Sequence, residues 1–216
     1  MTQPSTTAPG ALPPPRPSPR PWQRMLSGRR LDLFDPDPAD IEIVDIAHGL
    51  ARVARWNGQT DGAHAFSVAQ HSVLVDTLFC ALADREPGRQ ERLAALLHDA
   101  PEFVLGDLIS PFKAALGNTY RALEARLLDA VGQRFACEAA MADPALKSVI
   151  KTADRISAYY EAVELVRFAP HEAAGFFGTP PVLPPALQRE LTALAPQPAE
   201  AAQRDFLQRF AQIAAL

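Results

Sequence analysis

The stretch RLAALLHDAPE, residues 92–102, decides the fold of this chain. It is apolar almost all round up to residue 97, which predicts a central helix that is buried on every side. The stretch closes on His98 and Asp99, and Pro101 then interrupts the helical hydrogen-bond ladder. Because an aspartate is rarely buried without a partner or a metal ion, this pair indicates a polar site inside the protein.

Helical periodicity continues on both sides of this stretch. Upstream, apolar residues recur at helical spacing between Ile43 and Ala54, with Gly58 as the expected C-cap. A second helix is expected to open at Ser67 as N-cap, with Gln70 completing a capping box. β-Branched residues are sparse and period-two runs are absent, so the sequence predicts an all-α domain. Further helices are expected over 120–135, 144–168, 185–194 and 198–214, the last two being more peripheral.

The size and composition of the chain limit the number of domains and the classes of function that it can have. The chain of 216 residues fits one domain over 22–216, preceded by a proline-rich segment, 1–21, that we expect to be disordered. The net charge of −4 disfavours binding to a nucleic-acid polymer. Cys80 and Cys137 form no CxxC pair, which suits a reducing compartment. No apolar run approaches about 18 residues and no signal peptide is visible, so we expect a cytoplasmic protein that does not span a membrane.

Two imidazoles and two carboxylates form a candidate metal site. His71 lies on the apolar stripe of its helix, His98 and Asp99 close the next helix, and Asp154 borders the stripe of the helix 144–168. Such a set can hold a divalent ion and leave positions open for water and substrate. Each residue also has a simpler interpretation: a buried neutral imidazole for His71, an N-cap for Asp99, and a surface ion-pair network for Asp154.

Several sequence blocks in a fixed order resemble the HD-domain metal-dependent phosphohydrolases, and within them the bacterial 5′-deoxynucleotidase-like subgroup. The similar region runs from about residue 31 to residue 167, and its one departure within these blocks is Ile109, where a proline is common. The resemblance implies a bundle of about five core helices, to which 168–216 adds further helices. It also implies that His71, His98, Asp99 and Asp154 are the metal ligands. The blocks are Arg55-Trp56, FSVAQHS (66–72), LLHDAPE (96–102), GDLISPFK (106–113) and KTADR (151–155).

The resemblance also implies roles around the metal ion. The resemblance favours Glu102 as the acid/base over the alternative that it merely complements the N-terminus of the helix after Pro101. Asp107 is expected near the leaving group or the sugar, and its alternative is a helix cap. Arg55 and Lys113 are candidates for binding phosphate. Trp56 is expected to stack on the base or to pack against deoxyribose, with core filling as the alternative.

The leading functional hypothesis is hydrolysis of (deoxy)nucleoside 5′-monophosphates to nucleoside and phosphate, with Mn²⁺, Co²⁺, Fe²⁺ or Zn²⁺ as cofactor. The alternatives are a deoxynucleoside triphosphate triphosphohydrolase, which should carry more cations than Arg55 and Lys113, and a non-catalytic nucleotide sensor. The expected partner is a small-molecule nucleotide, and a homodimer is compatible with the sequence. His64 and Glu161 fall at matched positions without an assigned role.

Overall fold

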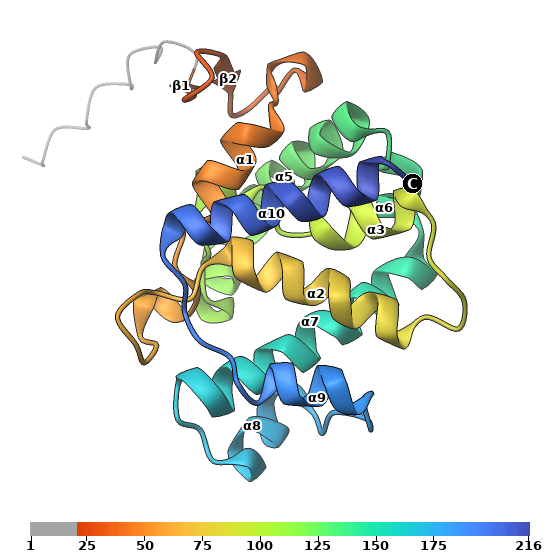
Figure 1. Cartoon of the computed structure of the whole chain (residues 1–216). Helices are drawn as coiled ribbons and strands as arrows, with labels where there is room; N and C mark the ends of the chain where they lie inside the picture. Colours follow the sequence, from red (N-terminus) through yellow and green to blue (C-terminus); the bar gives the residue numbers. More distant parts are fainter. Residues whose placement is uncertain (1–20) are drawn as a thin grey trace, which may run out of the picture.

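The helix pair α2 (Val68–Leu82) and α7 (Pro144–Leu165) forms the middle of the fold, and the two helices pack along each other (Figure 1). The computed structural model describes residues 21–216, so most of the expected disordered segment lies outside the described residues. Helix α2 also packs against α3 (Arg89–Leu96) and α10 (Ala199–Ala214). The predicted all-α class is confirmed. The other elements are β1 (Trp22–Arg24), β2 (Arg30–Asp32), α1 (Ile43–Leu50), α4 (Glu102–Leu105), α5 (Ser110–Phe135), α6 (Glu138–Ala142), α8 (Pro170–Phe177) and α9 (Pro185–Leu191).

Local sequence sets the ends of the helices that carry the site. The Ser67 hydroxyl accepts a hydrogen bond from the backbone N–H of Gln70 at 3.2 Å, which confirms the predicted N-cap of α2. Helix α3 ends at Leu96, earlier than predicted, and α4 begins directly after Pro101. Because the residue before a proline disfavours the helical conformation, His98 and Asp99 lie in the tight turn between the two helices rather than on a helix.

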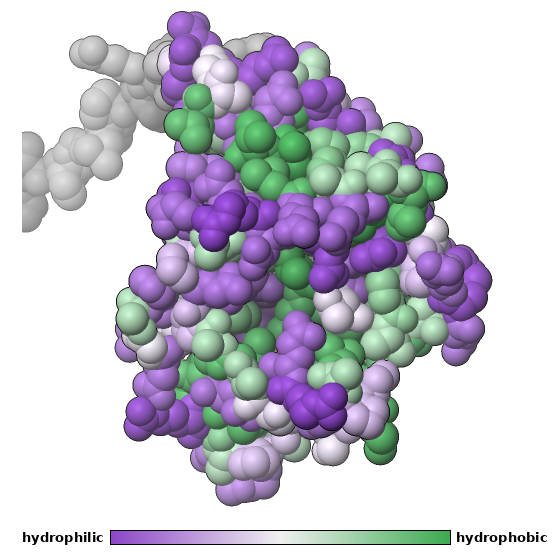
Figure 2. Space-filling view, in the orientation of Figure 1, coloured by the Kyte–Doolittle hydropathy of each residue, from purple (hydrophilic) through white to green (hydrophobic). Residues whose placement is uncertain are grey.

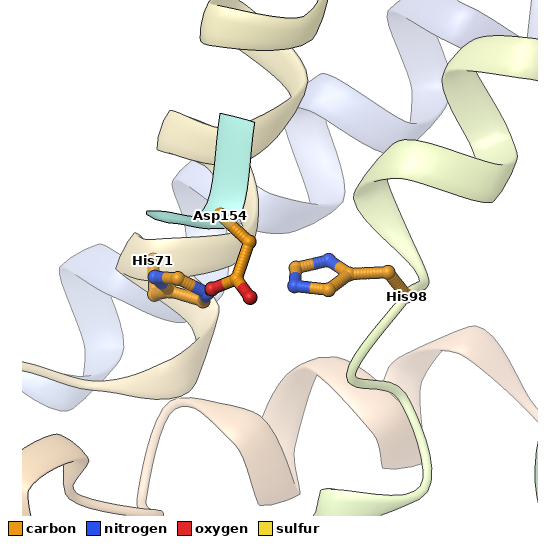
Figure 3. A group of neighbouring side chains, drawn as sticks. All are labelled: His71, His98 and Asp154. Atoms are coloured by element: carbon orange, nitrogen blue, oxygen red, sulfur yellow. The ribbon is translucent and has the colours of Figure 1, made fainter. Parts of the chain in front are cut away.

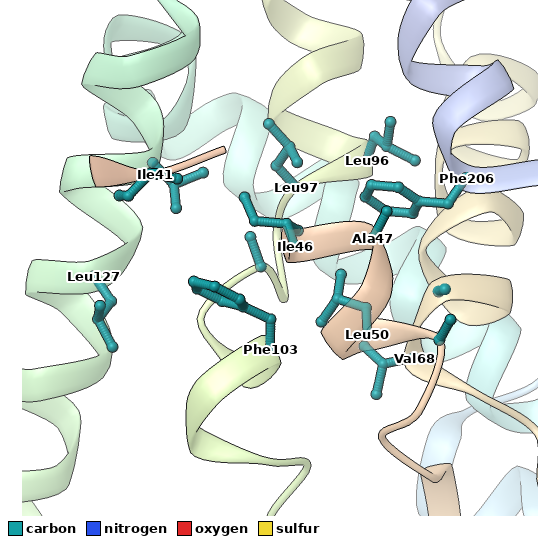
Figure 4. Packing of buried hydrophobic residues seen from close by; sticks show 14 of the residues in the cluster. Ile41, Ile46, Ala47, Leu50, Val68, Leu96, Leu97, Phe103, Leu127 and Phe206 are labelled. Atoms are coloured by element: carbon teal, nitrogen blue, oxygen red, sulfur yellow. The ribbon is translucent and has the colours of Figure 1, made fainter. Parts of the chain in front are cut away.

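The apolar core holds α2 from two sides. One cluster joins α1, α2, α3 and α10 through fully buried side chains such as Ile46, Leu96 and Phe206 (Figure 4). A second cluster joins α2 to α7 and α9, and includes Leu78 and Leu191. Burial of such side chains is the main stabilising contribution, about 25 cal/mol per Å² of apolar surface. It fixes α2 and α7, from which two of the candidate ligands project.

Helix α10 lies in the core, so the prediction that both C-terminal helices are peripheral was wrong. Phe206 and Ile213 are fully buried, while the outward side of α10 is largely hydrophilic (Figure 2). The buried carboxylate of Asp76 on α2 binds Arg209 of α10 at 2.6 Å and Arg92 of α3 at 2.7 Å. Because α10 lies at the end of the chain, we expected it to be an addition to the core bundle. Its contacts with distant helices make it part of the bundle.

Helix α1 is also shorter than its periodicity predicts, because it ends at Leu50. The chain then pairs with the start of α2: the N–H of Arg55 donates to the carbonyl of Phe66 at 2.8 Å. Trp56 follows in a 3₁₀ turn (Arg55–Gly58) with φ of 56°, a left-handed conformation that is uncommon for a bulky residue. Arg55 therefore lies outside helix α1.

Other elements were not predicted from the sequence. They are the hairpin β1–β2 and the short helices α6 and α8, whereas α4 is the helix expected after Pro101. None of the helices within residues 21–216 has the length and apolar character needed to cross a membrane.

Candidate active site

His71 on α2, His98 in the turn after α3, and Asp154 on α7 point toward one another (Figure 3). One ligand atom from each of the three side chains lies within 4.8 Å of the other two. The Asp99 carboxylate lies 3.5 Å from His71 Nε2 and 3.2 Å from His98 Nε2. Three separate segments of the chain therefore bring all of the predicted ligands to one point.

The hydrogen bonds of both rings fit a bound cation. His71 Nδ1 lies 2.6 Å from Glu161 Oε1, and His98 Nδ1 lies 2.9 Å from the carbonyl oxygen of Ala95. Because these partners are acceptors, each Nδ1 carries the proton and each neutral ring presents a lone pair at Nε2. Both Nε2 atoms are buried without a hydrogen-bond partner among the described residues. Lone pairs that face carboxylates across this short gap repel unless a cation lies between them, so the residues fit a divalent metal ion.

Electrostatics favour positive charge at this point. Burial and Arg55 lower the pKa of His71, but Glu161 and Asp154 outweigh them and raise it to about 9. Burial raises the pKa of the Asp99 carboxyl, yet His98 and His71 hold that pKa well below its usual value. In Asp154, the His71 imidazole 3.3 Å away likewise outweighs burial and lowers the pKa. The carboxylates stay ionised at neutral pH, and a proton and a metal ion compete for the same place.

Asp154 also makes the surface ion pair that was its alternative interpretation. Lys151 Nζ lies 2.6 Å from Asp154 Oδ2, while Oδ1 of the same carboxylate lies 3.3 Å from His71 Nε2. The two contacts use different oxygens, so the ion pair does not remove Asp154 from the ligand set. The alternative for Asp99 is not observed, since the N-cap residue of α4 is Pro101 and no side chain caps that helix.

Arg55 and Trp56 reach the site from the 3₁₀ turn. The Arg55 guanidinium lies 3.2 Å from Asp107 and 3.2 Å from Glu161, and the indole N–H of Trp56 donates to Glu161 at 2.8 Å. Asp107 is thus held by Arg55. The helix-cap alternative for Asp107 is not observed, because the N-cap residue of α5 is Ile109 without a side-chain cap.

Glu102 is buried at the start of α4 with 2% of its surface exposed. One carboxyl oxygen accepts a hydrogen bond from Lys113 Nζ at 3.2 Å, and the other has no partner among the described residues. Burial, Asp99 and Asp107 raise the pKa of Glu102 to about 9 against the opposing charge of Lys113. A carboxyl group that keeps its proton at neutral pH is suited to donate it.

A cavity of about 620 Å³ brings these groups together. Asp99 and Asp154 line it beside Glu102, Asp107 and Lys113, whereas His71 is fully buried beneath the surface. The cavity is also lined by Arg55 and Trp56. One hollow therefore contains the groups predicted to bind phosphate and to transfer a proton, together with two of the four predicted metal ligands, while His98 lines a neighbouring cavity that shares Asp99 and Asp154.

Comparison with known proteins agrees with this geometry. The family described as 5′-deoxynucleotidase YfbR-like matches residues 44–177, which include both histidines, Asp154 and all of the cavity-lining residues named above. The chain belongs to this family. Its members are HD-family metal-dependent 5′-deoxynucleotidases, so the protein is a hydrolase and the predicted resemblance is confirmed. An uncharacterized protein of Rhodobacter capsulatus is 59% identical over 165 residues, which are 76% of this chain and 83% of that protein.

Sequence reasoning assigned no role to the residue that links the two halves of this YfbR-like site. Glu161 is fully buried on α7, and its carboxylate joins the metal side to the substrate side, because one oxygen accepts from His71 and the other from Trp56. Ser157, one turn earlier on α7, donates to Glu161 at 2.7 Å. The sequence signals were that Glu161 falls at a position matched in the family resemblance and lies seven residues after Asp154, on the same border of the apolar stripe. His64, the other matched position without a role, is exposed.

Proposed function

We propose that this YfbR-like enzyme hydrolyses 2′-deoxynucleoside 5′-monophosphates to the nucleoside and orthophosphate. The observation that carries the proposal is the buried carboxyl group of Glu102, with one unpartnered oxygen, in the same cavity as Asp99 and Asp154. Phosphate-ester hydrolysis needs both a cation beside the phosphoryl group and a proton donor for the departing oxygen.

In this proposal His71, His98, Asp99 and Asp154 hold one divalent ion. Mixed imidazole and carboxylate ligands suit Mn²⁺, Co²⁺, Fe²⁺ or Zn²⁺ better than Ca²⁺. When bound, such an ion lowers the pKa of a water ligand toward neutrality and withdraws charge from a phosphoryl oxygen. Asp99 and Asp154 stay ionised at neutral pH, which favours the bound cation.

The remaining residues bind the substrate and move the proton. The attacking water releases one proton to solvent and its oxygen bonds to phosphorus while the bond between phosphorus and O5′ breaks. Glu102 gives its proton to O5′ of the leaving nucleoside and afterwards regains a proton from solvent. Arg55 orients the phosphate with its guanidinium group. Lys113 holds the Glu102 carboxyl in place through the 3.2 Å contact and adds positive charge beside the phosphate. Asp107 and the ring of Trp56 line the region for the deoxyribose.

The cations of the cavity bear on the second candidate, a triphosphohydrolase. Lys151 and Arg155 line the cavity in addition to Arg55 and Lys113, which is the excess of cations that this candidate requires. However, three of these cations contact a carboxylate: Arg55 lies 3.2 Å from Asp107, Lys113 lies 3.1 Å from Glu124, and Lys151 lies 2.6 Å from Asp154. Among the cationic side chains that line the cavity, Arg155 alone forms no ion pair with another residue in 21–216. The free positive charge therefore suits one phosphate group better than three.

Product analysis tests both candidates. Purified protein is supplied with Mn²⁺, Co²⁺, Fe²⁺ or Zn²⁺ and with deoxynucleoside mono- and triphosphates, and the released phosphate is identified by ³¹P NMR. We expect orthophosphate from monophosphates. Release of inorganic triphosphate would establish the second candidate instead. Nucleotide binding without turnover under every metal would leave a sensor and overturn the proposal.

Two variants assign the residue roles. D99A should lose both metal retention and turnover, whereas E102Q should lose turnover and keep the metal. E124Q is the matched control, because Glu124 binds the same Lys113 at 3.1 Å but does not line the cavity. Turnover by E102Q at the rate of E124Q would remove Glu102 from the mechanism.

A further inference from the structure

The cavity beside the metal site has apolar lining side chains, most of which the proposed reaction does not use. Besides its charged groups, the cavity is lined by seven apolar or aromatic side chains. No asparagine, glutamine, serine or threonine is among the described residues that line it. This part of the lining therefore offers ring faces and hydrocarbon rather than side-chain amides or hydroxyls. The residues are Trp56, Leu108, Ile109, Pro111, Ala158, Phe176 and Phe177.

Phe176 is an unusual member of this set because 69% of its surface is exposed. It lies in the last turn of α8, which packs against α7. Its ring meets Phe168 at a centroid distance of 5.9 Å and Phe177 at 6.2 Å. Aromatic neighbours thus fix the position of a ring that faces the cavity, although burial would stabilise such a side chain by about 1.5–3 kcal/mol. An exposed aromatic ring of this kind, held in a cavity, is typical of a binding surface.

The aromatic cluster continues to the sugar end of the site. Phe177 meets Trp56 edge-on, with ring centroids 5.9 Å apart and an interplanar angle of 81°. The indole N–H of Trp56 is already used by Glu161, so the ring can contact a ligand only through its apolar surface. A nucleotide whose phosphate lies at Asp99 and Asp154 and whose sugar lies at Trp56 extends its third part, the base, along this cluster.

We infer that Phe176, supported by Phe177, forms a stacking wall for the nucleobase of the substrate. The inference rests on the proposed function, because it assumes that the phosphate binds at the metal end. Stacking on an aromatic face tolerates every base, since every base has a π-face. Among the lining side chains that the structure describes, none is an amide or a hydroxyl that could read the edge of a base. The wall therefore predicts a broad base specificity in which the larger purine rings bind more tightly than pyrimidines.

Steady-state kinetics of F176A test the wall with two substrates that differ only by the base: 2′-deoxyadenosine 5′-monophosphate and 2-deoxyribose 5-phosphate. The KM for the nucleotide should rise roughly 5- to 100-fold, because loss of one aromatic stacking partner has this effect. The kcat for the nucleotide and the kcat/KM for the base-free phosphate should stay unchanged. F176W should restore the nucleotide KM. F112A is the matched control, since Phe112 is 58% exposed and does not line the cavity.

Equal losses on both substrates, or an unchanged nucleotide KM in F176A, would overturn the inference. Binding of 2′-deoxyadenosine, measured by ligand-observed NMR, separates this failure from failure of the proposed function. The nucleoside carries no phosphate, so it reports on the wall even if no phosphate ester is hydrolysed. We expect binding to wild type and to F112A and much weaker binding to F176A. Equal binding to wild type and F176A, or none to wild type, would also overturn the wall.

Discussion

Replacement of Glu161 by glutamine tests whether one buried carboxylate positions His71, a proposed metal ligand. The carboxylate accepts hydrogen bonds on both sides: from His71 Nδ1 at 2.6 Å and Ser157 at 2.7 Å on one oxygen, and from Trp56 Nε1 at 2.8 Å on the other. A glutamine side chain has one acceptor oxygen and one NH₂ donor. If its oxygen faces His71, its NH₂ group faces the indole N–H of Trp56, and the reverse orientation places donor against donor at His71.

The magnitude follows from the position of Glu161 behind the ligand. Loss of an outer-shell partner of a ligating histidine weakens metal affinity by about 10- to 100-fold. This factor equals about 1.4–2.7 kcal/mol, close to the range of about 1.5–3 kcal/mol for a hydrogen bond to a charged group. We therefore expect the Kd for Mn²⁺ of E161Q to rise by about 10- to 100-fold.

Isothermal titration calorimetry with Mn²⁺ measures this effect, and melting of the metal-free protein by circular dichroism separates it from loss of folding. D76N is the matched control, because Asp76 is an equally buried carboxylate that binds Arg92 and Arg209 rather than a metal ligand. Both variants should melt earlier without metal, and only E161Q should lose affinity for Mn²⁺. A Kd of E161Q within about twofold of wild type would refute the positioning role, since the expected change is at least about tenfold.

Further measurements address the proton donor, the core and the metal. In metal-free protein, burial raises the pKa of Glu102 to about 9, so the folded state holds a proton that the unfolded state releases above about pH 4.5. The folded state therefore loses stability as the pH rises toward 9. Between about pH 6 and 8, the unfolding free energy of wild type should fall by up to about 1.4 kcal/mol per pH unit more than that of E102Q. Equal slopes of unfolding free energy against pH for the two proteins, measured by urea denaturation, would contradict the raised pKa. F206A should lose about 3–5 kcal/mol of unfolding free energy because Phe206 is fully buried; a loss below about 1 kcal/mol would place α10 outside the core. Saturating Mn²⁺ at about 100 times its Kd should raise the unfolding free energy by about 2.7 kcal/mol, and D154N should abolish this rise in thermal shift assays.

The helices that carry the site were largely predictable, because their signals are local. Ser67 caps α2 as expected, and Pro101 separates α3 from α4. The ligand candidates His71 and Asp154 stood out for the same reason, since each lies on or beside an apolar stripe of its own helix. Glu161 did not, because its partner His71 is 90 positions away in the chain.

The boundaries near Arg55 were predicted less well. Periodicity continued the first helix to Ala54, but pairing of the chain with the start of α2 ends that helix at Leu50. The same pairing turns Arg55 and Trp56 toward Glu161. No local sequence pattern predicts such a turn. The left-handed φ of Trp56 is stabilised by the hydrogen bond from its indole to Glu161 on α7 rather than by its sequence neighbours.

By itself the sequence determined which segments become helices, where prolines interrupt them, and which acid, base and ligand side chains are available. These properties depend on residues within a few positions of each other, through backbone hydrogen bonding and side-chain periodicity. Only the tertiary structure decided that α10 belongs to the core, that Glu161 joins the metal and substrate sides, and that Phe176 faces the cavity. Those outcomes depend on which surfaces lose contact with water when distant helices pack, a quantity that no short stretch of sequence contains.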